Sequence, residues 1–498
     1  MPGKRIAVIG AGVSGLGAIK VCLEEGLEPT CFEETNDIGG LWRYEEETKG
    51  GRASVYRSAT SNTLKEMTTY SDYPFPDHFP NYLHNSRIME YLRMYAQHFD
   101  LMKHIRFLVH SVRKRSDFSS TGQWDVMVET TGKQESYVFD GIMVCSGLYT
   151  DAVLPLQNFP GIQGFKGQYM HSCDYRSPEK FEGKKIVVVG IGNSGADLAI
   201  ELSHVASQVY LSTRQGAWIW NRVWDNGMPM DTALFTRFKN TLNKFYPNIL
   251  NQQFLRHQVT FGDDLPNHII SGRVLIKSNI REFTETSAIF EDGTEEDLDV
   301  VIFATGYTFS LPFLENNATI LDSQHSMFKY VFPPQLEKPT LAFIGILKPV
   351  GAIIPTSELQ KSHLSFLGLN KLPSVNGMMA DIRQKRKKFE KEVQYVDYMD
   401  EIATEIGVKP NLPSLFLWDP KLAMEIFFGP CTPYQYRLQG PGKWAGARRA
   451  ILTQRARIIK PLRTRTFAHD QLPYSVPFWL KSACAALLFV LTLVIMKG

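Results

Sequence analysis

Short runs of consecutive apolar residues recur along the chain and predict buried parallel strands. Runs 6–9 and 186–189 are rich in β-branched residues, and each leads through a glycine-rich turn into a segment with the pattern of a helix. Runs 141–145, 300–304 and 341–344 have the same continuous apolar character, which is typical of strands covered on both faces. Strands that alternate with helices in this way predict an α/β protein with doubly wound parallel sheets.

Both glycine-rich turns have the spacing G-x-G-x-x-G. Their residues are Gly10, Ala11, Gly12, Val13, Ser14 and Gly15 in the first turn, and Gly190, Ile191, Gly192, Asn193, Ser194 and Gly195 in the second. Between a strand and a helix, the first glycine permits a tight turn, the second lets the backbone approach a pyrophosphate, and the third allows close helix packing. The N-terminus of the helix attracts the anion. The sequence therefore predicts two Rossmann-like dinucleotide-binding domains.

In each domain, a charged residue follows the strand that comes after the glycine-rich turn and its helix. The two charges are opposite in sign, so a different cofactor is assigned to each domain. Run 29–32 leads to Glu33, whose carboxylate can accept hydrogen bonds from ribose hydroxyls but would repel a 2′-phosphate. FAD or NAD fits this first site. Run 209–211 is followed by Arg214, whose guanidinium can pair with a 2′-phosphate. The second site is therefore predicted to bind NADPH.

The order of the apolar runs predicts that the second domain is inserted into the first. A chain of 498 residues is long enough for two or three domains. If the first fold is nearly complete by residue 147, run 341–344 can return to its sheet after the second fold has ended. The expected division is 1–155 for the first part of the FAD-binding domain, 156–310 for the NADPH-binding domain, 311–460 for the FAD-domain return with a substrate- and membrane-facing region, and 474–498 for a hydrophobic anchor.

Composition excludes several other classes of function. The net charge is only +3, from 54 basic and 51 acidic residues, so nucleic acid is not an expected partner. The six cysteines form no C-x-x-C pair, which argues against a zinc site or a redox dithiol and favours a reducing compartment. The first strand begins almost at the N-terminus, so no cleaved leader is expected.

The C-terminal segment 478–496 is strongly apolar and predicts attachment to a membrane. Its uncharged part, 482–496, is shorter than the roughly 20 residues that span a bilayer upright, so spanning requires Lys481 to reach the interface. Whether the segment spans the bilayer or lies in one leaflet stays open. The alternative is a buried C-terminal helix.

The segment before the second glycine-rich turn carries the most specific pattern in the chain. Residues 165–175 match F-x-G-x-x-x-H-x-x-x-Y, and the stretches 39–42, 61–62, 303–307, 429–433 and 440–444 support the same assignment. With these motifs the chain resembles, nearly from end to end, the flavin-containing monooxygenases of the animal microsomal type, the N-oxide-forming dimethylaniline monooxygenases. The histidine of the pattern, His171, is expected to have a hinge or structural role rather than to transfer a proton.

The resemblance implies an enzyme that uses NADPH, FAD and O2. In that family NADPH reduces FAD, and a C4a-hydroperoxyflavin then transfers one oxygen atom to a soft nitrogen or sulfur nucleophile of a lipophilic small molecule. The oxidant is the cofactor, so the chain needs neither a catalytic triad nor a metal. The resemblance also implies the endoplasmic reticulum membrane as location, contact with membrane lipid, and a possible homo-oligomer.

The resemblance assigns a role to each matching residue. Asn62 is implied as the catalytic amide, at the point where flavin, oxygen and nicotinamide meet. The implied FAD-binding residues are the first glycine-rich turn with Glu33, Gly40, Leu41, Trp42 and Asn62. The implied NADP-binding residues are Gly190, Gly192 and Asn193 of the second turn, with Ser61, Asn62, Ser194, Gly195, Ala196, Asp197, Leu198 and Arg214.

Several positions depart from the family pattern and leave alternative functions open. Glu34 and Cys173 stand where relatives have arginine, Leu148 stands where they have histidine, and the segments near 250–263 and 361–363 are shortened or changed. These departures put substrate turnover in doubt while cofactor binding looks intact. The alternatives are ketone oxygenation of the Baeyer–Villiger type, uncoupled oxidation of NADPH, and a catalytically weak membrane protein that binds FAD and NADP.

Overall fold

The computed structural model describes residues 3–47, 52–107, 111–130, 133–224, 227–245, 259–315, 327–362, 372–388 and 393–463. The apolar C-terminal segment, for which the sequence predicts an anchor, lies outside these residues. Within the described ranges, no helix has the length and apolar character that crossing a membrane requires.

The first sheet is built from parallel strands in the order β20-β7-β1-β2-β3. These strands are β1 (Arg5–Ile9), β2 (Glu28–Glu33), β3 (Ile105–Phe107), β7 (Gly141–Val144) and β20 (Leu341–Phe343). Alternate residues of β1 pack on opposite faces: Ile6 and Val8 against helix α1 (Val13–Glu24), and Ala7 and Ile9 against a β-meander. The continuous apolar run of β1 is therefore explained by two covered faces, as the sequence predicts.

The second sheet has the parallel order β14-β11-β10-β18-β9. Its strands are β9 (Gln168–His171), β10 (Lys185–Val189), β11 (Gln208–Ser212), β14 (Val274–Lys277) and β18 (Val300–Phe303). Helices α4 (Asn193–Leu202) and α8 (Leu265–Ile270) cover one face of this sheet. A second meander of β15 (Ile280–Phe283), β16 (Ser287–Phe290) and β17 (Glu295–Asp297) covers the other.

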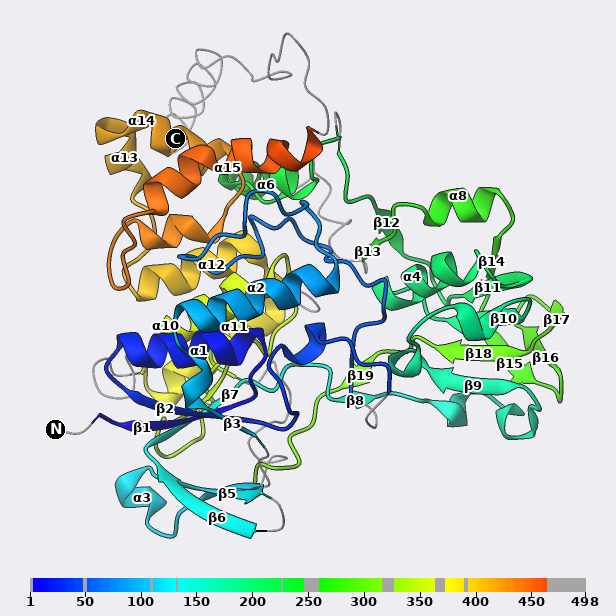
Figure 1. Ribbon diagram of the computed structural model, residues 1–498, viewed down its shortest axis with the longest axis horizontal. Helices are drawn as coiled ribbons and strands as arrows, with labels where there is room; N and C mark the ends of the chain where they lie inside the picture. Colours follow the sequence, from blue (N-terminus) through cyan, green and yellow to red (C-terminus); the bar gives the residue numbers. More distant parts are fainter. Residues whose placement is uncertain are drawn as a thin grey trace.

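The two sheets are interleaved in the sequence but separate in space. Strand β20 comes after the second sheet in the chain and pairs with β7 of the first, in the register Leu341 to Ile142. The chain thus leaves the first sheet after β7, builds the second sheet, and returns; Figure 1 shows the second sheet to the right of the first. The α/β class with parallel sheets is confirmed. The prediction that the sheets are doubly wound is wrong, because in the described part of the chain helices cover one face of each sheet and a β-meander covers the other. The boundaries at 155, 310 and 460 stay predictions.

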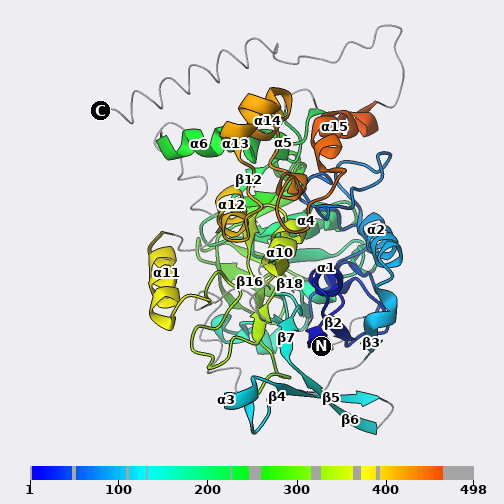
Figure 2. The same ribbon diagram turned by 90° about the vertical axis from the view of Figure 1, so that its left-hand side faces the viewer.

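A helical region lies at one end of the molecule, and the meander of the first sheet lies at the other (Figures 1 and 2). The helices of this region are α5 (Asp231–Leu234), α6 (Arg237–Phe245), α12 (Tyr395–Glu405), α13 (Leu412–Trp418), α14 (Pro420–Phe428) and α15 (Ala447–Ile459). Three further helices, α2 (Asn85–His98), α10 (Ile353–Ser362) and α11 (Val375–Lys388), pack with α1 beside the first sheet. The meander consists of β4 (Ser111–Lys114), β5 (Trp124–Thr130) and β6 (Lys133–Phe139), with the short helix α3 (Phe118–Thr121). Short strand pairs complete the fold: β8 (Asp151–Ala152) with β19 (Tyr307–Thr308), β12 (Trp218–Trp220) with β13 (Val259–Phe261), and β21 (Pro349–Val350) with β22 (Val393–Gln394).

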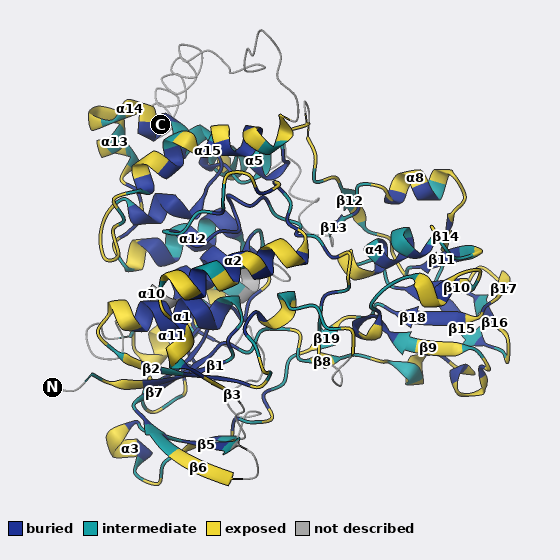
Figure 3. Ribbon diagram, in the orientation of Figure 1, coloured by how far each residue is buried: buried dark blue, intermediate teal, exposed yellow. Residues whose placement is uncertain are grey.

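Burial follows this layered arrangement. In Figure 3 the central strands of both sheets and the inner faces of α1 and α10 are buried, while β9 at the edge of the second sheet and β6 are largely exposed. The described core separates into clusters on the two faces of each sheet and under the helical region.

A buried ion pair joins the helical region to the segment after β2. Glu66 is completely buried, and Arg457 of α15 donates to its two carboxylate oxygens at 3.0 and 2.7 Å. The hydroxyl of Tyr434 donates to the same carboxylate at 2.8 Å. Charges buried in this way are stable only while both partners are present.

Replacing Arg457 by Met should therefore leave Glu66 buried without its cation and lower the free energy of unfolding by about 3–5 kcal/mol. Denaturant unfolding measured by circular dichroism checks this. Arg448→Met is the matched control, because Arg448 pairs with Asp419 on the surface with 57% of its side chain exposed. We expect its unfolding midpoint to stay near that of the unmodified chain; equal loss in both variants would contradict the assignment.

Candidate functional site

The first glycine-rich turn connects β1 to α1 with a geometry that only glycine tolerates. Gly10 has φ of +103°, and its N–H donates to the carbonyl of Phe32 at 2.7 Å. A side chain on Gly15 would place its first carbon 1.8 Å from the Gly10 carbonyl oxygen. The third glycine of the motif is therefore required by the close contact between helix and strand, as the sequence predicts.

A large cleft opens beside this turn. It encloses about 1620 Å³ of space, including its open mouth. Its lining includes many residues of the predicted FAD set, namely Gly10, Gly12, Val13, Ser14, Glu33, Gly40, Leu41 and Trp42. Ala11 and Gly15 lie behind the lining and are buried. The structure thus gathers these residues, which come from three separate segments, around one cavity.

Glu33 stands at the end of β2 with its carboxylate held in place. Only 6% of the residue is exposed, and one carboxylate oxygen accepts from the N–H of Ala11 at 2.6 Å. The other oxygen accepts from the N–H and hydroxyl of Thr35 at 3.0 and 2.8 Å. A carboxylate has about four acceptor positions, so these bonds leave room for one ribose hydroxyl rather than two. Thr35 was not predicted from the sequence. Its hydroxyl, two residues after the carboxylate of Glu33, was the feature that could have indicated it.

Unpaired buried polar atoms in the cleft indicate that it accommodates a polar ligand. Within the described ranges, Arg43 Nη1, Ser146 Oγ and Arg176 Nε are buried without a hydrogen-bond partner, and all three residues line the cleft. Leaving such groups unpaired costs free energy that a ligand can recover. No described side chain caps α1, so the N–H groups of its first turn are available as well. A cleft of this size with these donors fits FAD.

The second glycine-rich turn reproduces the first. Gly190 has φ of +110° and donates to the carbonyl of Ser212 at 2.9 Å. A side chain on Gly195 would lie 1.9 Å from the Gly190 carbonyl oxygen. No described side chain caps α4, and Asn193 and Ser194 are exposed at its start. The turn therefore presents N–H donors to an anion in the same way, which fits the pyrophosphate of NADPH.

Other residues of the predicted NADP set lie in different surroundings. Ala196 and Leu198 are buried in the core of the second domain, where their side chains pack against apolar residues. Asp197 faces the first domain and accepts a hydrogen bond from the hydroxyl of Tyr56, and burial raises the pKa of this carboxyl. Arg214 is exposed, and among the described residues it makes no ion pair. Its guanidinium is available for a 2′-phosphate.

Asn62 lies at the seam between the two domains rather than in the lining of the first cleft. Its side-chain oxygen accepts a hydrogen bond from Arg222 at 2.6 Å. Arg222 also pairs with Asp263 of the second domain at 2.6 Å. Ser61 is buried and its hydroxyl is used locally, because it accepts from the N–H of Leu83 at 2.9 Å. Sequence reasoning missed Arg222, which no local motif marks.

A polar hollow of about 690 Å³ adjoins this seam. It is lined by Tyr56, Ser58, Asp197, Glu201, Arg222 and Asp263, among others. The hydroxyl of Ser58 donates to Glu201 at 2.7 Å, so two residues of α4 are bonded to the segment that precedes Asn62. The position of α4 and its glycine-rich turn relative to Asn62 depends on these contacts.

Three of the departures from the family pattern, at Glu34, Leu148 and Cys173, can be placed in the structure, whereas residues 250–258 and 363 of the changed segments lie outside the described residues. Glu34 forms an ion pair with Arg52 at the mouth of the cleft, so an arginine is still present there. Leu148 lines the cleft and also packs against the core. Cys173 is buried, which raises the pKa of its thiol to about 11.

The two ring nitrogens of His171 are both close to backbone groups. The N–H of Cys173 donates to His171 Nδ1 at 3.1 Å, while the other ring nitrogen of His171 lies 3.0 Å from the Gly306 carbonyl. The histidine is wholly buried, which fits the predicted structural role.

Comparison with known proteins gives the same assignment over nearly the whole chain. A family model described as flavin-binding monooxygenase-like matches residues 3–497. The rabbit (Oryctolagus cuniculus) protein flavin-containing monooxygenase 5 is 56% identical, over 93% of this chain and 94% of its own length. The mouse (Mus musculus) dimethylaniline monooxygenase [N-oxide-forming] 2 is 50% identical, over 95% of this chain and 96% of its own length.

A solved structure supports the fold. The S-allyl-L-cysteine S-oxygenase from Allium sativum superposes with a TM-score of 0.64 at 24% identity, over 84% of this chain and 92% of that chain. The cleft geometry and the sequence comparisons lead to one conclusion. The chain belongs to the flavin-binding monooxygenase-like family and is a flavoprotein monooxygenase that uses FAD, NADPH and O2.

Proposed function

We propose that this enzyme transfers one oxygen atom of O2 to nitrogen or sulfur atoms of lipophilic small molecules. The observation that carries the proposal is the pairing of two equivalent glycine-rich turns with groups of opposite charge, Glu33 at the first and the exposed Arg214 at the second. The name of the mouse relative, which refers to an N-oxide-forming activity, supports nitrogen as an acceptor atom.

The residues of the chain bind and orient, and the cofactors supply the redox chemistry. When bound, FAD and NADPH provide the reducing equivalents and the activation of O2. The first turn of α1 binds the FAD pyrophosphate, and Glu33 accepts from a ribose hydroxyl. Arg214 pairs with the 2′-phosphate of NADPH. Arg222 donates to the oxygen of the Asn62 amide and so orients it, and the two N–H groups of that amide are the donors for the reacting groups.

Oxygen-transfer assays on purified holoenzyme test the substrate class. With NADPH and ¹⁸O₂, we expect N,N-dimethylaniline and a dialkyl thioether to give an N-oxide and a sulfoxide that each carry one labelled oxygen, detected by mass spectrometry. A ketone in the same assay tests for Baeyer–Villiger oxygenation, whose product is a labelled ester. An ester without any N-oxide or sulfoxide would overturn the proposal, and so would NADPH consumption that yields only hydrogen peroxide.

The cofactor assignment predicts the effect of removing Arg214. Arg214→Ala should raise the KM for NADPH by about 10- to 100-fold, because a charge-assisted hydrogen-bonded pair is lost. The KM for NADH should stay nearly unchanged, since NADH has no 2′-phosphate. Arg281→Ala is the matched control: Arg281 is an exposed arginine of the same domain, and its ion pair among the described residues is with its neighbour Glu282. Equal losses for NADPH and NADH would contradict the assignment.

We also propose that the C-terminal segment 474–498 attaches the enzyme to the membrane of the endoplasmic reticulum. Support comes from the apolar composition of the segment. A chain ending at Arg463 should appear in the soluble fraction of disrupted cells, whereas the full chain should sediment with membranes and resist washing at high salt. A shortened chain that still sediments would assign membrane attachment to another part of the protein.

A further inference from the structure

Tyr70 makes a hydrogen bond to the first turn of α1, the turn that faces the FAD pyrophosphate. The residue is completely buried, and its hydroxyl donates to the carbonyl oxygen of Val13 at 2.7 Å. Tyr70 lies outside every motif of the sequence and does not line the cleft. We propose that Tyr70 is a positioning residue for FAD, and that Arg437 of the C-terminal region holds it in place.

The geometry of the peptide unit explains how a bond to a carbonyl affects an anion site. The carbonyl of Val13 and the N–H of Ser14 belong to one planar peptide unit and point in opposite directions. The first intrahelical bond runs from the Leu16 N–H to the Gly12 carbonyl at 3.0 Å, so the Ser14 N–H precedes it and is directed out of the helix. Tyr70 therefore fixes the direction of a donor in the lining of the cleft and polarises it.

Tyr70 has little freedom to move. Its ring stacks on Tyr95 with centroids 3.8 Å apart, and its backbone N–H donates to the hydroxyl of Tyr91 at 2.9 Å. Both partner tyrosines belong to α2, which is packed in the same core cluster as α1. The hydroxyl of Tyr70 is thus supported by a rigid aromatic stack.

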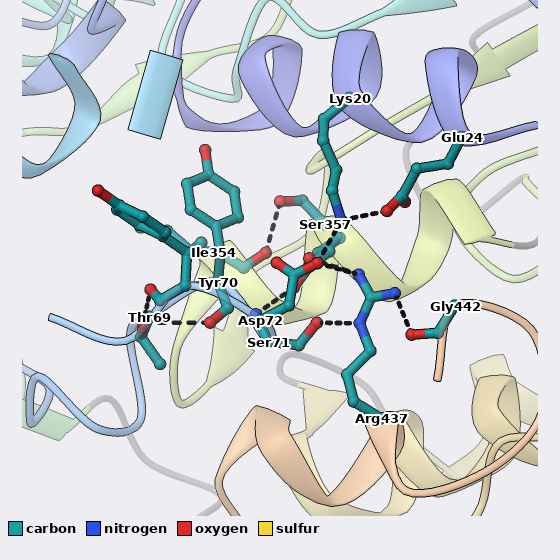
Figure 4. A network of polar contacts seen from close by, with 12 residues as sticks. Lys20, Glu24, Thr69, Tyr70, Ser71, Asp72, Ile354, Ser357, Arg437 and Gly442 are labelled. Atoms are coloured by element: carbon teal, nitrogen blue, oxygen red, sulfur yellow. Dashed lines mark hydrogen bonds and ion pairs between the residues drawn. The ribbon is translucent and has the colours of Figure 1, made fainter. Parts of the chain in front are cut away.

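The next two residues attach this loop to the C-terminal region (Figure 4). Arg437 donates to the hydroxyl oxygen of Ser71 at 2.5 Å and to Glu358 of α10 at 3.1 Å. Glu358 also accepts from the N–H of Ser71 at 2.8 Å. Asp72 forms an ion pair with Lys20 of α1 and lies 3.4 Å from Arg437. The loop 70–72 therefore holds α1 at Val13 and at Lys20, and Arg437 holds the loop.

The second domain offers an internal comparison. In the second turn, the residue equivalent to Val13 is Asn193, and none of the described side chains donates a hydrogen bond to its carbonyl. NADPH is consumed as a reductant and must be exchanged in every cycle, whereas FAD is regenerated in place. A backbone N–H held in place through Tyr70 suits the first site, where FAD stays bound. A backbone N–H without such a contact suits the second site, where NADPH is exchanged.

Tyr70→Phe tests the proposal because it removes only the hydroxyl and keeps the aromatic stack. We expect the Kd for FAD to rise about five- to tenfold, since one supporting hydrogen bond is lost. The Kd is measured from the flavin fluorescence released when holoenzyme is diluted to equilibrium. The Kd for NADP⁺ of the undiluted holoenzyme should stay unchanged.

Ser71→Ala, which removes one partner of Arg437, should raise the Kd for FAD by about two- to fivefold.

Tyr434→Phe is the matched control, because Tyr434 is equally buried and its hydroxyl bonds Glu66 instead of α1. It should lower the melting temperature without changing the Kd for FAD. A Kd for Tyr70→Phe within twofold of the unmodified enzyme would overturn the proposal, and so would an equal rise in Tyr70→Phe and Tyr434→Phe. These measurements need no substrate, so their outcome is independent of the substrate class proposed above.

Discussion

The contact between the first turn of a helix and the strand before it is the constraint on which the rest of this structure depends. At both glycine-rich turns the helix lies so close to the strand that a side chain on the third glycine would meet a carbonyl oxygen at 1.8 or 1.9 Å. This contact directs the helix N-terminus toward the end of the sheet. Backbone N–H groups then face a cleft that an anion can enter. The residues that distinguish the two sites lie around this shared arrangement of strand, glycine-rich turn and helix.

The two sites differ in the sign of their charged residue and in the hydrogen bonds made by the residues around it. At the first site Glu33 is fixed by Ala11 and Thr35, and the helix turn is fixed by Tyr70. At the second site Arg214 is exposed, and residues of α4 bond across the seam to Tyr56 and Ser58. The charged group of the first site is thus buried and hydrogen-bonded, whereas that of the second site is exposed. Such a division suits an enzyme in which one cofactor is retained and the other is exchanged.

Residues of both domains are bonded to each other at the seam between them. Arg222 bonds Asn62 of the first domain and Asp263 of the second, so the amide implied in catalysis is oriented by a residue outside its own domain. Buried networks around Arg437 and Arg457 connect the helical region to the segment 66–72, which follows Asn62 closely in the chain. The segment 62–72 is therefore bonded to two other parts of the protein, the second domain and the C-terminal region.

The sequence by itself determined the α/β class, both glycine-rich turns, and the opposite charges of Glu33 and Arg214. These features depend on residues only a few positions apart, whose backbone geometry follows from local spacing. The tertiary structure alone decided that Asp197 bonds Tyr56, that Ala196 and Leu198 belong to the core, and that Arg222 holds Asn62. It also brought Tyr70 to Val13 and Arg437 to Ser71. These pairs join residues far apart in the chain, so they depend on how sheets and helices pack, and no local pattern encodes that packing.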